Sequence, residues 1–381
     1  MKITELSSCY GCSACNSICP TECIRLELNI EGFLQPVVDE QQCIKCNKCD
    51  EVCPLFKEIE MSDDIQKSYY GWHNDENIRR LSSSGGIYSS ISNYVVQNGG
   101  IAFGAIYETE SNRVIHSSNK SNNLNLQRKS KYVQSNPMET FKQAKEYCED
   151  GRLVLYSGTP CQIYGLKCFL GKEYDNLITC DFICHGVPSI SVYSDYISFL
   201  EKKHKSKVES LDFRSKEMGW KKHSLQVKFK NEDCINNFFM LDLYFKGFVI
   251  DNLFLNRECY NCRFREKHYS DIVLADFWGV AKFDNSLDDD KGISLVIVNT
   301  ERGEQIKKTL ENVTINDLDW KYSKYVYKSS ETHLKSLDKR TDFFKIYPSR
   351  GIIKAINKTS EYNHSIQLIK RAVRKLKGLD Y

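Results

Sequence analysis

The sequence has no hydrophobic stretch long enough to cross a membrane. Its 381 residues contain no apolar run that approaches the roughly 20 residues a bilayer-spanning helix needs. The first eight residues also lack the charged and then apolar layout of a secretory signal peptide. We therefore expect a cytoplasmic protein.

The chain also lacks a large excess of charge and the common nucleotide-binding fingerprints. It has 53 Lys and Arg residues against 50 Asp and Glu residues, a formal net charge of +3. Nucleic acid is not an expected partner, because binding to it depends on a basic surface. Neither GxGxxG nor GxxxxGK followed by Ser or Thr occurs. A standard dinucleotide fingerprint and an ATP-type phosphate loop are therefore both unsupported.

Cysteine, in contrast, is abundant and unevenly distributed. Nine of the seventeen cysteines fall within the first 53 residues. Without an export signal, metal or redox use explains them better than a disulfide framework does. We therefore treat residues 1–60 as a separate domain, followed by a polar linker at residues 62–67.

Two cysteine runs in this domain share the pattern C-x2-C-x2-C-x3-C-P, at residues 9–20 and 43–54. This spacing is typical of bacterial ferredoxins with two 4Fe-4S clusters, in which the fourth cysteine of each run ligates the other cluster. A pair of zinc knuckles is the alternative, and Cys23 is interpreted as a packing residue. The predicted ligands are Cys9, Cys12, Cys15 and Cys53 for one cluster, and Cys43, Cys46, Cys49 and Cys19 for the other.

The rest of the chain alternates between predicted strands and helices. Residues 69–72 and 99–105 are expected to form strands, and an SSSGG turn at residues 82–86 opens a predicted helix at 87–96. Such a turn can cradle phosphate or can be an ordinary helix start. Strands at 153–156 and 177–183, each followed by a turn and a helix, predict an α/β sheet with ligands at the strand ends.

Four further cysteines lie in turns of this second part. They are Cys161, Cys184, Cys259 and Cys262, the last two as a C-x2-C pair. They are sufficient for a third 4Fe-4S cluster. A zinc site with four thiolates and four unrelated cysteines remain the alternatives from spacing alone.

The ordered set of motifs resembles the coenzyme F420 hydrogenase/dehydrogenase beta-subunit family, whose members often carry an N-terminal dicluster ferredoxin domain. The matching segments are SSSGG at 82–86, SKYVQS at 130–135, SGTPCQ at 157–162, CHGVP at 184–188, CYNC at 259–262 and DFWG at 276–279. The resemblance implies an α+β or α/β chain: a small two-cluster ferredoxin domain, a mixed α/β body that binds FAD, and a C-terminal helix. It divides the body at residues 68–150 and 151–345, and it favours the third cluster.

The resemblance also implies roles for individual residues. FAD phosphates are expected near the SSSGG turn, and the flavin near the 131–132 and 159–162 segments, with two residues of the DFWG motif closing the site. His185 is a candidate proton donor or, alternatively, a structural neighbour of the cluster, and packing is an equal alternative for the tryptophan. The predicted cofactor-binding residues are Ser84, Gly85, Gly86, Lys131, Tyr132, Thr159, Pro160, Gln162, Asp276 and Trp278.

The expected function is an iron–sulfur flavoprotein oxidoreductase that passes electrons from 4Fe-4S clusters to FAD and on to an unidentified organic acceptor. Its expected partner is a redox protein or a ferredoxin. The rivals are an electron-bridging subunit with no small substrate of its own and a zinc-stabilised interaction module. The basic tail at residues 346–381 carries apolar positions at helical spacing. We expect it to dock on the body, with binding to a membrane surface as the alternative.

Overall fold

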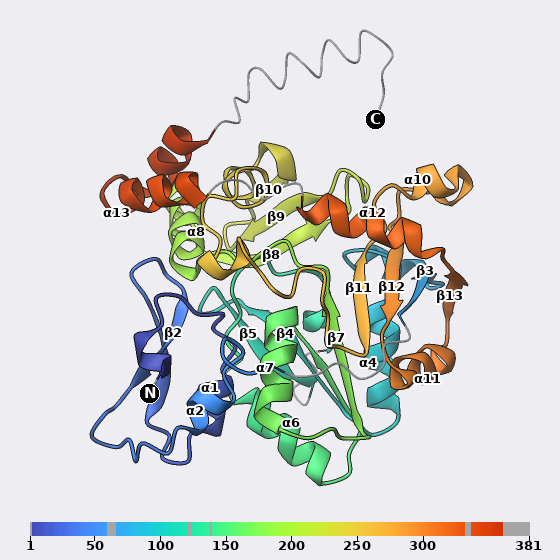
Figure 1. Cartoon of the computed structure of the whole chain (residues 1–381). Helices are drawn as coiled ribbons and strands as arrows, with labels where there is room; N and C mark the ends of the chain where they lie inside the picture. The colour runs from blue at the N-terminus through green and yellow to red at the C-terminus, as the bar shows by residue number, and fades with distance from the viewer. Residues whose placement is uncertain (1, 59–65, 120–123, 138, 332–336, 361–381) are drawn as a thin grey trace.

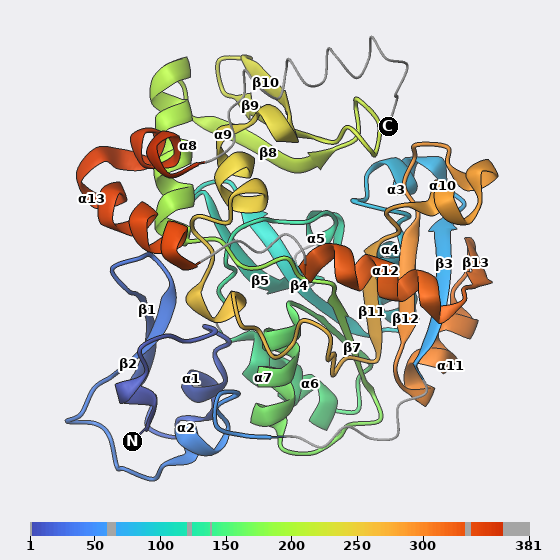
Figure 2. The same ribbon diagram turned by 45° about the horizontal axis from the view of Figure 1, so that its top comes forward.

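The computed structural model describes residues 2–58, 66–119, 124–137, 139–331 and 337–360. Three packed parts make up this portion of the chain, as Figure 1 shows: an N-terminal domain, a central sheet with helices on both faces, and a smaller sheet beside two long helices. Figure 2 shows that the N-terminal domain lies against the side of the central part that carries α6 (Thr140–Glu149) and α7 (Pro160–Leu170). Among the helices in the described ranges, none combines the length and the apolar character needed to span a membrane.

The N-terminal domain is built around its cysteine runs. A short helix follows the first two cysteines of each run, α1 (Ala14–Ile18) in one and α2 (Lys48–Glu51) in the other. Between the runs, β1 (Ile24–Leu28) and β2 (Leu34–Val38) form an antiparallel hairpin. The duplicated sequence thus gives two similar loop-and-helix units.

The central sheet is mixed, with four parallel strands in its middle. Three of these four strands lie side by side in the order of the sequence. In contrast, β3 (Lys67–His73) pairs with β12 (Ser294–Val298) and β13 (Val313–Asp317), which come more than two hundred residues later in the chain. Strands from both sides of residue 150 therefore share one sheet. Its order is β13 (Val313–Asp317), β3 (Lys67–His73), β12 (Ser294–Val298), β11 (Ile272–Asp276), β7 (Leu177–Phe182), β6 (Val154–Ser157), β4 (Ile101–Glu108) and β5 (Arg113–Ser118).

Helices cover both faces of this sheet, because successive strand residues point to opposite sides. Phe103 packs with α6 (Thr140–Glu149) and α7 (Pro160–Leu170), whereas Ala102 packs with α4 (Ile87–Gln97). In β6, Val154, Leu155 and Tyr156 are completely buried. An uninterrupted apolar strand is the expected pattern for a sheet covered on both faces. The remaining helices on this part are α3 (Glu76–Arg80), α5 (Leu124–Gln127), α10 (Val280–Phe283), α11 (Glu301–Thr309) and α12 (Trp320–Glu331).

The third part has its own aromatic core. The strands β8 (Val208–Ser215), β9 (Ser224–Phe229) and β10 (Cys234–Phe238) pair in sequence order and pack with α8 (Ile190–His204), the short α9 (Leu243–Phe245) and α13 (Leu337–Thr359). Gly351, with φ of 73°, interrupts α13, and glycine adopts this conformation at little cost. This part places β8 beside the segment around residue 83 of the central part.

The structure confirms the predicted mixed α/β body. The expected strands at 69–72, 99–105, 153–156 and 177–183 correspond to β3, β4, β6 and β7, and the expected helix at 87–96 corresponds to α4. The C-terminal helix is α13, which begins before the predicted tail. The amphipathic segment that sequence placed at residues 366–376 lies outside the described residues.

Buried polar contacts fix the N-terminal domain against the body. The Gln134 side chain, which is 3% exposed, accepts a hydrogen bond from the Leu34 amide at 2.9 Å and donates to the Tyr10 carbonyl at 3.2 Å. Arg340 of α13 forms an ion pair with Glu31 of the β1–β2 turn. The domain is therefore attached by directional contacts at two places as well as by apolar packing.

Replacement of Gln134 by alanine tests the first of these contacts. Gln134→Ala leaves the buried Leu34 amide and Tyr10 carbonyl without their partner, so we expect a loss of about 1–3 kcal/mol in the free energy of unfolding. Urea denaturation measures it, with Gln97→Ala at the exposed end of α4 as the control. Equal midpoints for the two variants would show that Gln134 does not help to hold the domain.

Candidate iron–sulfur and flavin sites

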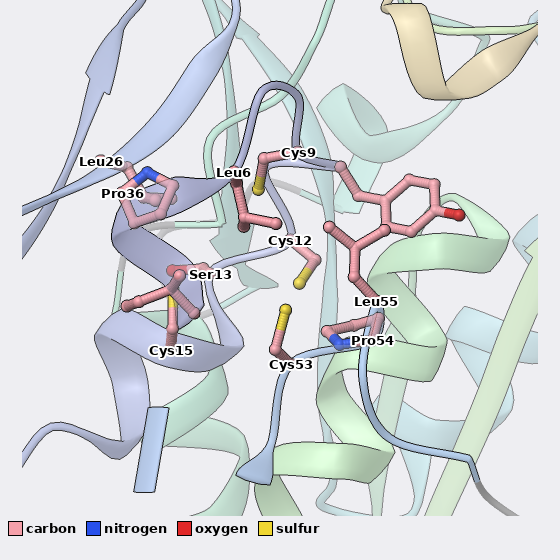
Figure 3. Close-up of a pocket in the computed structure, with 12 residues that line it drawn as sticks. Leu6, Cys9, Cys12, Ser13, Cys15, Leu26, Pro36, Cys53, Pro54 and Leu55 are labelled. Atoms are coloured by element: carbon pink, nitrogen blue, oxygen red, sulfur yellow. The ribbon is translucent and has the colours of Figure 1, made fainter. Parts of the chain in front are cut away.

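The structure brings the eight N-terminal cysteines together in two pockets. The first pocket contains Cys9, Cys12, Cys15 and Cys53 and is closed by apolar side chains such as Leu6, Leu26 and Leu55. Figure 3 shows the sulfur atoms of Cys9, Cys12 and Cys53 pointing into one space. The fourth cysteine of the second run thus joins the first three of the first run.

The second pocket shows the reciprocal exchange. It contains Cys43, Cys46 and Cys49 together with Cys19 from the first run. Cys46 is exposed and Cys43 half-buried, whereas all four cysteines of the first pocket are buried. The second pocket therefore lies nearer to solvent than the first.

The duplicated spacing explains why both pockets form. Gly11 and Lys45 occupy equivalent positions of the two runs and both have positive φ, 67° and 54°. Their amides donate to the sulfur atoms of Cys9 at 3.3 Å and Cys43 at 3.4 Å. This turn directs backbone N–H groups toward the pocket, where they can stabilise negative charge on sulfur. In the first run a side chain has no room, because a Cβ on Gly11 would lie 2.5 Å from Gln134 Nε2.

Cys23 belongs to the second pocket, a role that its spacing did not indicate. Its sulfur lies 3.4 Å from that of Cys19, and its side chain is 5% exposed. Burial acts to raise the pKa of Cys19. Hydrogen bonds from Thr21 and Cys23 act in the opposite direction and together have the larger effect, so the pKa lies below the usual value for a thiol. Cys23 therefore contacts a predicted ligand and is more than a packing residue.

The third cysteine set comprises Cys161, Cys184, Cys259 and Cys262, and the fold gathers it from three separate segments. Cys161 lies in the first turn of α7, and Cys184 follows β7, so both are at the end of the parallel strands. Cys161 and Cys262 pack against the same apolar cluster, and the Cys259 sulfur accepts a hydrogen bond at 3.3 Å from the amide of Val187, three residues after Cys184. Sequence separations of tens of residues are thus closed by the sheet and by the loop at residues 256–265.

The chemistry of the cysteine sets fits iron–sulfur ligation. Burial is the main cause that raises the pKa of Cys9 and of Cys184 to about 12, and neighbouring thiols add to it. The pKa values of Cys12, Cys15 and Cys259 are shifted upward for the same reasons. Buried thiolates of this kind require a bound cation, which iron supplies in a cluster.

Within the described ranges, no three His, Cys, Asp or Glu side chains converge on a position for a single metal ion. A 4Fe-4S cluster makes a different demand, since it takes one thiolate at each of its irons. In each of the two pockets the predicted cysteine ligands surround one space, as such a cluster requires.

The predicted flavin residues of the SSSGG turn lie at the start of α4. Gly86 is the N-cap with φ of 95° and provides no side-chain cap, so the first amides of this 11-residue helix have no partner from that position. The Ser84 hydroxyl donates to the Ile293 carbonyl at 2.6 Å, and the Gly85 amide donates to Ser294 Oγ at 3.0 Å. These two residues therefore attach the turn to β12, and the expected contact of Ser84, Gly85 and Gly86 with FAD phosphates stays a prediction.

Two basic residues of β8 and its end, Arg214 and Lys216, complete this region and were missed from sequence. Arg214 donates to the Ser83 carbonyl at 3.1 Å and to both oxygens of Asp276 at 2.9 and 3.0 Å. Lys216 donates to the carbonyls of Arg79, Ser84 and Lys291. Because Arg214 follows Ser83 by 131 residues, no local pattern indicated this contact.

Lys131 and Tyr132 lie near the same turn and contribute in different ways. The Lys131 ammonium donates to the Leu126 and Arg128 carbonyls at 2.6 and 2.5 Å, and burial lowers its pKa to about 7. The Tyr132 hydroxyl accepts from Arg214 at 3.1 Å, and its ring packs among phenylalanines. Lys131 thus adds positive potential, whereas Tyr132 orients Arg214.

The 159–162 segment is occupied by helix capping. The Thr159 hydroxyl accepts from the Gln162 amide at 3.4 Å and the Gln162 side chain accepts from the Thr159 amide at 3.0 Å, a complete capping box with Pro160 at the first helical position. Gln162 is 4% exposed and also donates to Ser135. These contacts give Thr159, Pro160 and Gln162 a structural role, because they fix the start of α7 and with it the position of Cys161. The expected flavin contact for them stays a prediction.

His185 and Trp278 have structural partners. His185 Nε2 lies 2.7 Å from Asn252 Nδ2, and its ring meets Phe248 edge-on at 5.4 Å. Trp278 stacks on Trp220 at 4.3 Å with 7° between the ring planes. These contacts favour a structural role for both side chains.

Two cysteine pockets in a small domain, built from a duplicated ferredoxin-type spacing, are the arrangement of an iron–sulfur protein. Residues 8–56 match the family model for the 4Fe-4S dicluster domain. Residues 151–319 match the family model for the C terminus of the coenzyme F420 hydrogenase/dehydrogenase beta subunit. Over residues 151–319 the chain is therefore similar to the C-terminal part of the coenzyme F420 hydrogenase/dehydrogenase beta subunit, and it carries an N-terminal 4Fe-4S dicluster domain.

A solved structure of the F420-reducing NiFe hydrogenase complex from Methanosarcina barkeri contains a chain similar to this one at 15% identity. The match covers 72% of this chain and 92% of that chain, with a TM-score of 0.46. No curated protein sequence matches the chain.

Replacement of Cys23 separates a hydrogen-bonding role from ligation. In Cys23→Ala we expect the iron content of the wild type and a lower reduction potential for one cluster, because a donor to Cys19 sulfur stabilises the more negative reduced state. Iron counting and an EPR-monitored redox titration measure the two effects. The comparison variant Cys19→Ala should lose about four irons. A similar loss in Cys23→Ala would identify Cys23 as a ligand.

Proposed function

We propose that the chain is an iron–sulfur flavoprotein oxidoreductase that passes electrons from 4Fe-4S clusters to FAD and on to an organic acceptor. The observation that carries this proposal is the grouping of twelve cysteines into three sets that run from the N-terminal domain into the body. The matches to the two family models support redox chemistry. In this proposal, residues 1–60 receive electrons from a redox protein or a ferredoxin, and residues 68–345 deliver them.

The FAD phosphates are proposed to lie at the start of α4, between Gly86 and the basic groups of Arg214, Lys216 and Lys131. A helix N-terminus and nearby cations favour an anion together more than either does alone. Arg214 is held in place by Asp276, whose pKa is lowered by the charge of that arginine in spite of burial. The ion pair fixes the guanidinium next to the Ser83 carbonyl.

When bound, FAD supplies the conversion between single-electron transfer at iron–sulfur centres and the two-electron reduction of an organic molecule. The residues of this chain hold the cofactors. The capping box at the start of α7 orients Cys161, whose sulfur lies 3.1 Å from Thr159 Oγ1. The start of α7, which carries Cys161, and the start of α4, where the FAD phosphates are proposed to lie, therefore both belong to the central part of the fold.

Anaerobic reconstitution tests the cofactor content. We expect about twelve irons per chain and flavin absorption bands after addition of FAD. A count of eight irons would contradict the proposed third cluster. The absence of flavin affinity would contradict the proposal that the chain is a flavoprotein. If both cofactors bind but no organic acceptor reoxidises the reduced protein, an electron-bridging subunit becomes the better description.

The pH dependence of FAD binding tests the phosphate site. Burial lowers the pKa of Lys216 to about 7, so its ammonium is protonated below that pH and loses its proton as the pH rises through it. An anion favours the protonated form, and FAD affinity should therefore fall as the pH rises from 6 to 9, by about tenfold for one charged contact. The charged groups that act on Lys216 are Asp276, which raises its pKa, and Arg214, Arg79 and Lys129, which lower it.

Fluorescence titration of FAD at each pH measures this effect. Lys216→Met should bind FAD more weakly at pH 6 and show a smaller pH dependence, whereas Lys222→Met, at an exposed position nearby, should behave as the wild type. An affinity that rises with pH in the wild type would contradict the proposed site.

A further inference from the structure

The two pockets of the N-terminal domain differ in their distance from the body. The walls of the second pocket come from residues 19–49, and its Cys46 is exposed. The first pocket is buried and belongs to the same apolar cluster as α7, through Cys12, Tyr10 and Ala14. The first pocket thus shares an apolar core with the body.

Helix α7 connects the first pocket to the third cysteine set. Cys161 lies in its first turn and Gly165 lies four residues later, a rise of about 6 Å along the helix. A Cβ on Gly165 would lie 2.8 Å from Cys12 Sγ and 2.9 Å from Cys12 Cβ. The glycine therefore allows a sulfur of the first pocket to touch the backbone of the helix that carries Cys161.

Tyr10 occupies the space between the same two groups of cysteines. It lies between Cys9 and Cys12 in sequence, is 8% exposed, and packs edge-on against Phe264 at 5.3 Å. Tyr10, Cys12 and Phe264 belong to one apolar cluster, and Cys161 and Cys262 pack against that cluster. The ring of Tyr10 is therefore next to the first pocket and the third set at once.

Hydrogen bonds from the loop at residues 256–259 make a further connection. Asn256 Nδ2 donates to the Cys9 carbonyl at 2.8 Å, and the Ser8 hydroxyl donates to Glu258. Glu258 directly precedes Cys259 of the third set. The peptide segment of Cys9 is thus held by the loop that carries two of the third set's cysteines.

We infer that the three sites form one fixed line, in which electrons enter at the second pocket, pass through the first pocket, and reach the third set across the junction made by Tyr10 and Gly165. This inference rests on the proposed function. At each step one electron leaves the reduced site and enters the next, with no bond formed or broken, and a one-electron carrier protein supplies the first. Tyr10 and Gly165 are positioning residues, because they set how closely the two sites approach.

Magnetic interaction between reduced clusters tests the order without an activity measurement. In the reduced full-length protein, Cys46→Ala removes the second-pocket cluster, and the EPR signal of the third cluster should remain split by its neighbour. Cys12→Ala removes the first-pocket cluster and should abolish that splitting. Cys53→Ala provides a second variant for the same pocket if Cys12→Ala does not fold.

Loss of the splitting in Cys46→Ala, or its retention in Cys12→Ala or Cys53→Ala, would overturn the order. Iron counting separates this failure from that of the proposed function. Twelve irons with the wrong pattern of splitting refutes the order alone. About eight irons in the wild type removes the third cluster and with it the line of three sites, whereas the proposed flavoprotein fails only if FAD does not bind.

Gly165→Ala tests the junction itself. The added methyl group must displace Cys12, so we expect a smaller splitting between the first and third signals and an unchanged signal from the second pocket. Lys167→Ala, on the same helix and paired with Glu173 at 3.2 Å, is the control. A splitting in Gly165→Ala equal to that of the wild type would show that this contact does not set the approach of the two sites.

Discussion

Burial of thiols that must ionise is the constraint on which this structure depends. The first pocket and the third set place cysteines where the neutral thiol is favoured, through burial first and through the neighbouring sulfurs second. A cluster reverses that preference, because its iron offsets the charge of every thiolate at once. For a domain of this size, apolar burial alone gives little stability, so cluster binding and folding of the N-terminal domain are expected to be linked.

The same constraint explains why the domain is packed against the body. The polar segment at residues 62–67 is predicted to be a linker, and residues 62–65 of it lie outside the described residues. The described contacts join the N-terminal domain to the body at several points. Tyr164 donates to the Lys57 carbonyl at 2.9 Å and Arg263 to the Pro54 carbonyl at 3.1 Å, both close to Cys53. These contacts hold the segment that follows Cys53, a cysteine of the first pocket, against the body. A domain that swung freely would expose that pocket, whereas the fixed arrangement leaves only the second pocket near solvent.

Local patterns in the sequence were enough to predict many elements of the fold. The strand-turn-helix alternation indicated β6, α7, β7 and α8, and the SSSGG turn marked the start of α4. The position of β3 between β12 and β13 could not be predicted, since pairing between strands more than two hundred residues apart leaves no local signal. The Thr159-to-Gln162 spacing is itself a capping-box signature. It could have shown that these side chains are engaged within α7.

The candidate sites, like the fold, could be predicted from the sequence only in part. Cysteine spacing carries its own geometry, because the chain between ligands is too short for many alternatives. The basic groups at the start of α4 come from a different part of the fold, and only the approach of β8 to residue 83 reveals Arg214 and Lys216. Gly165 shows the limit most clearly. Alanine is the better helix former at that position, so a glycine inside α7 signals a close contact, but the sequence does not say with what. The structure identifies Cys12, and this contact turns two separate cysteine patterns into neighbouring sites.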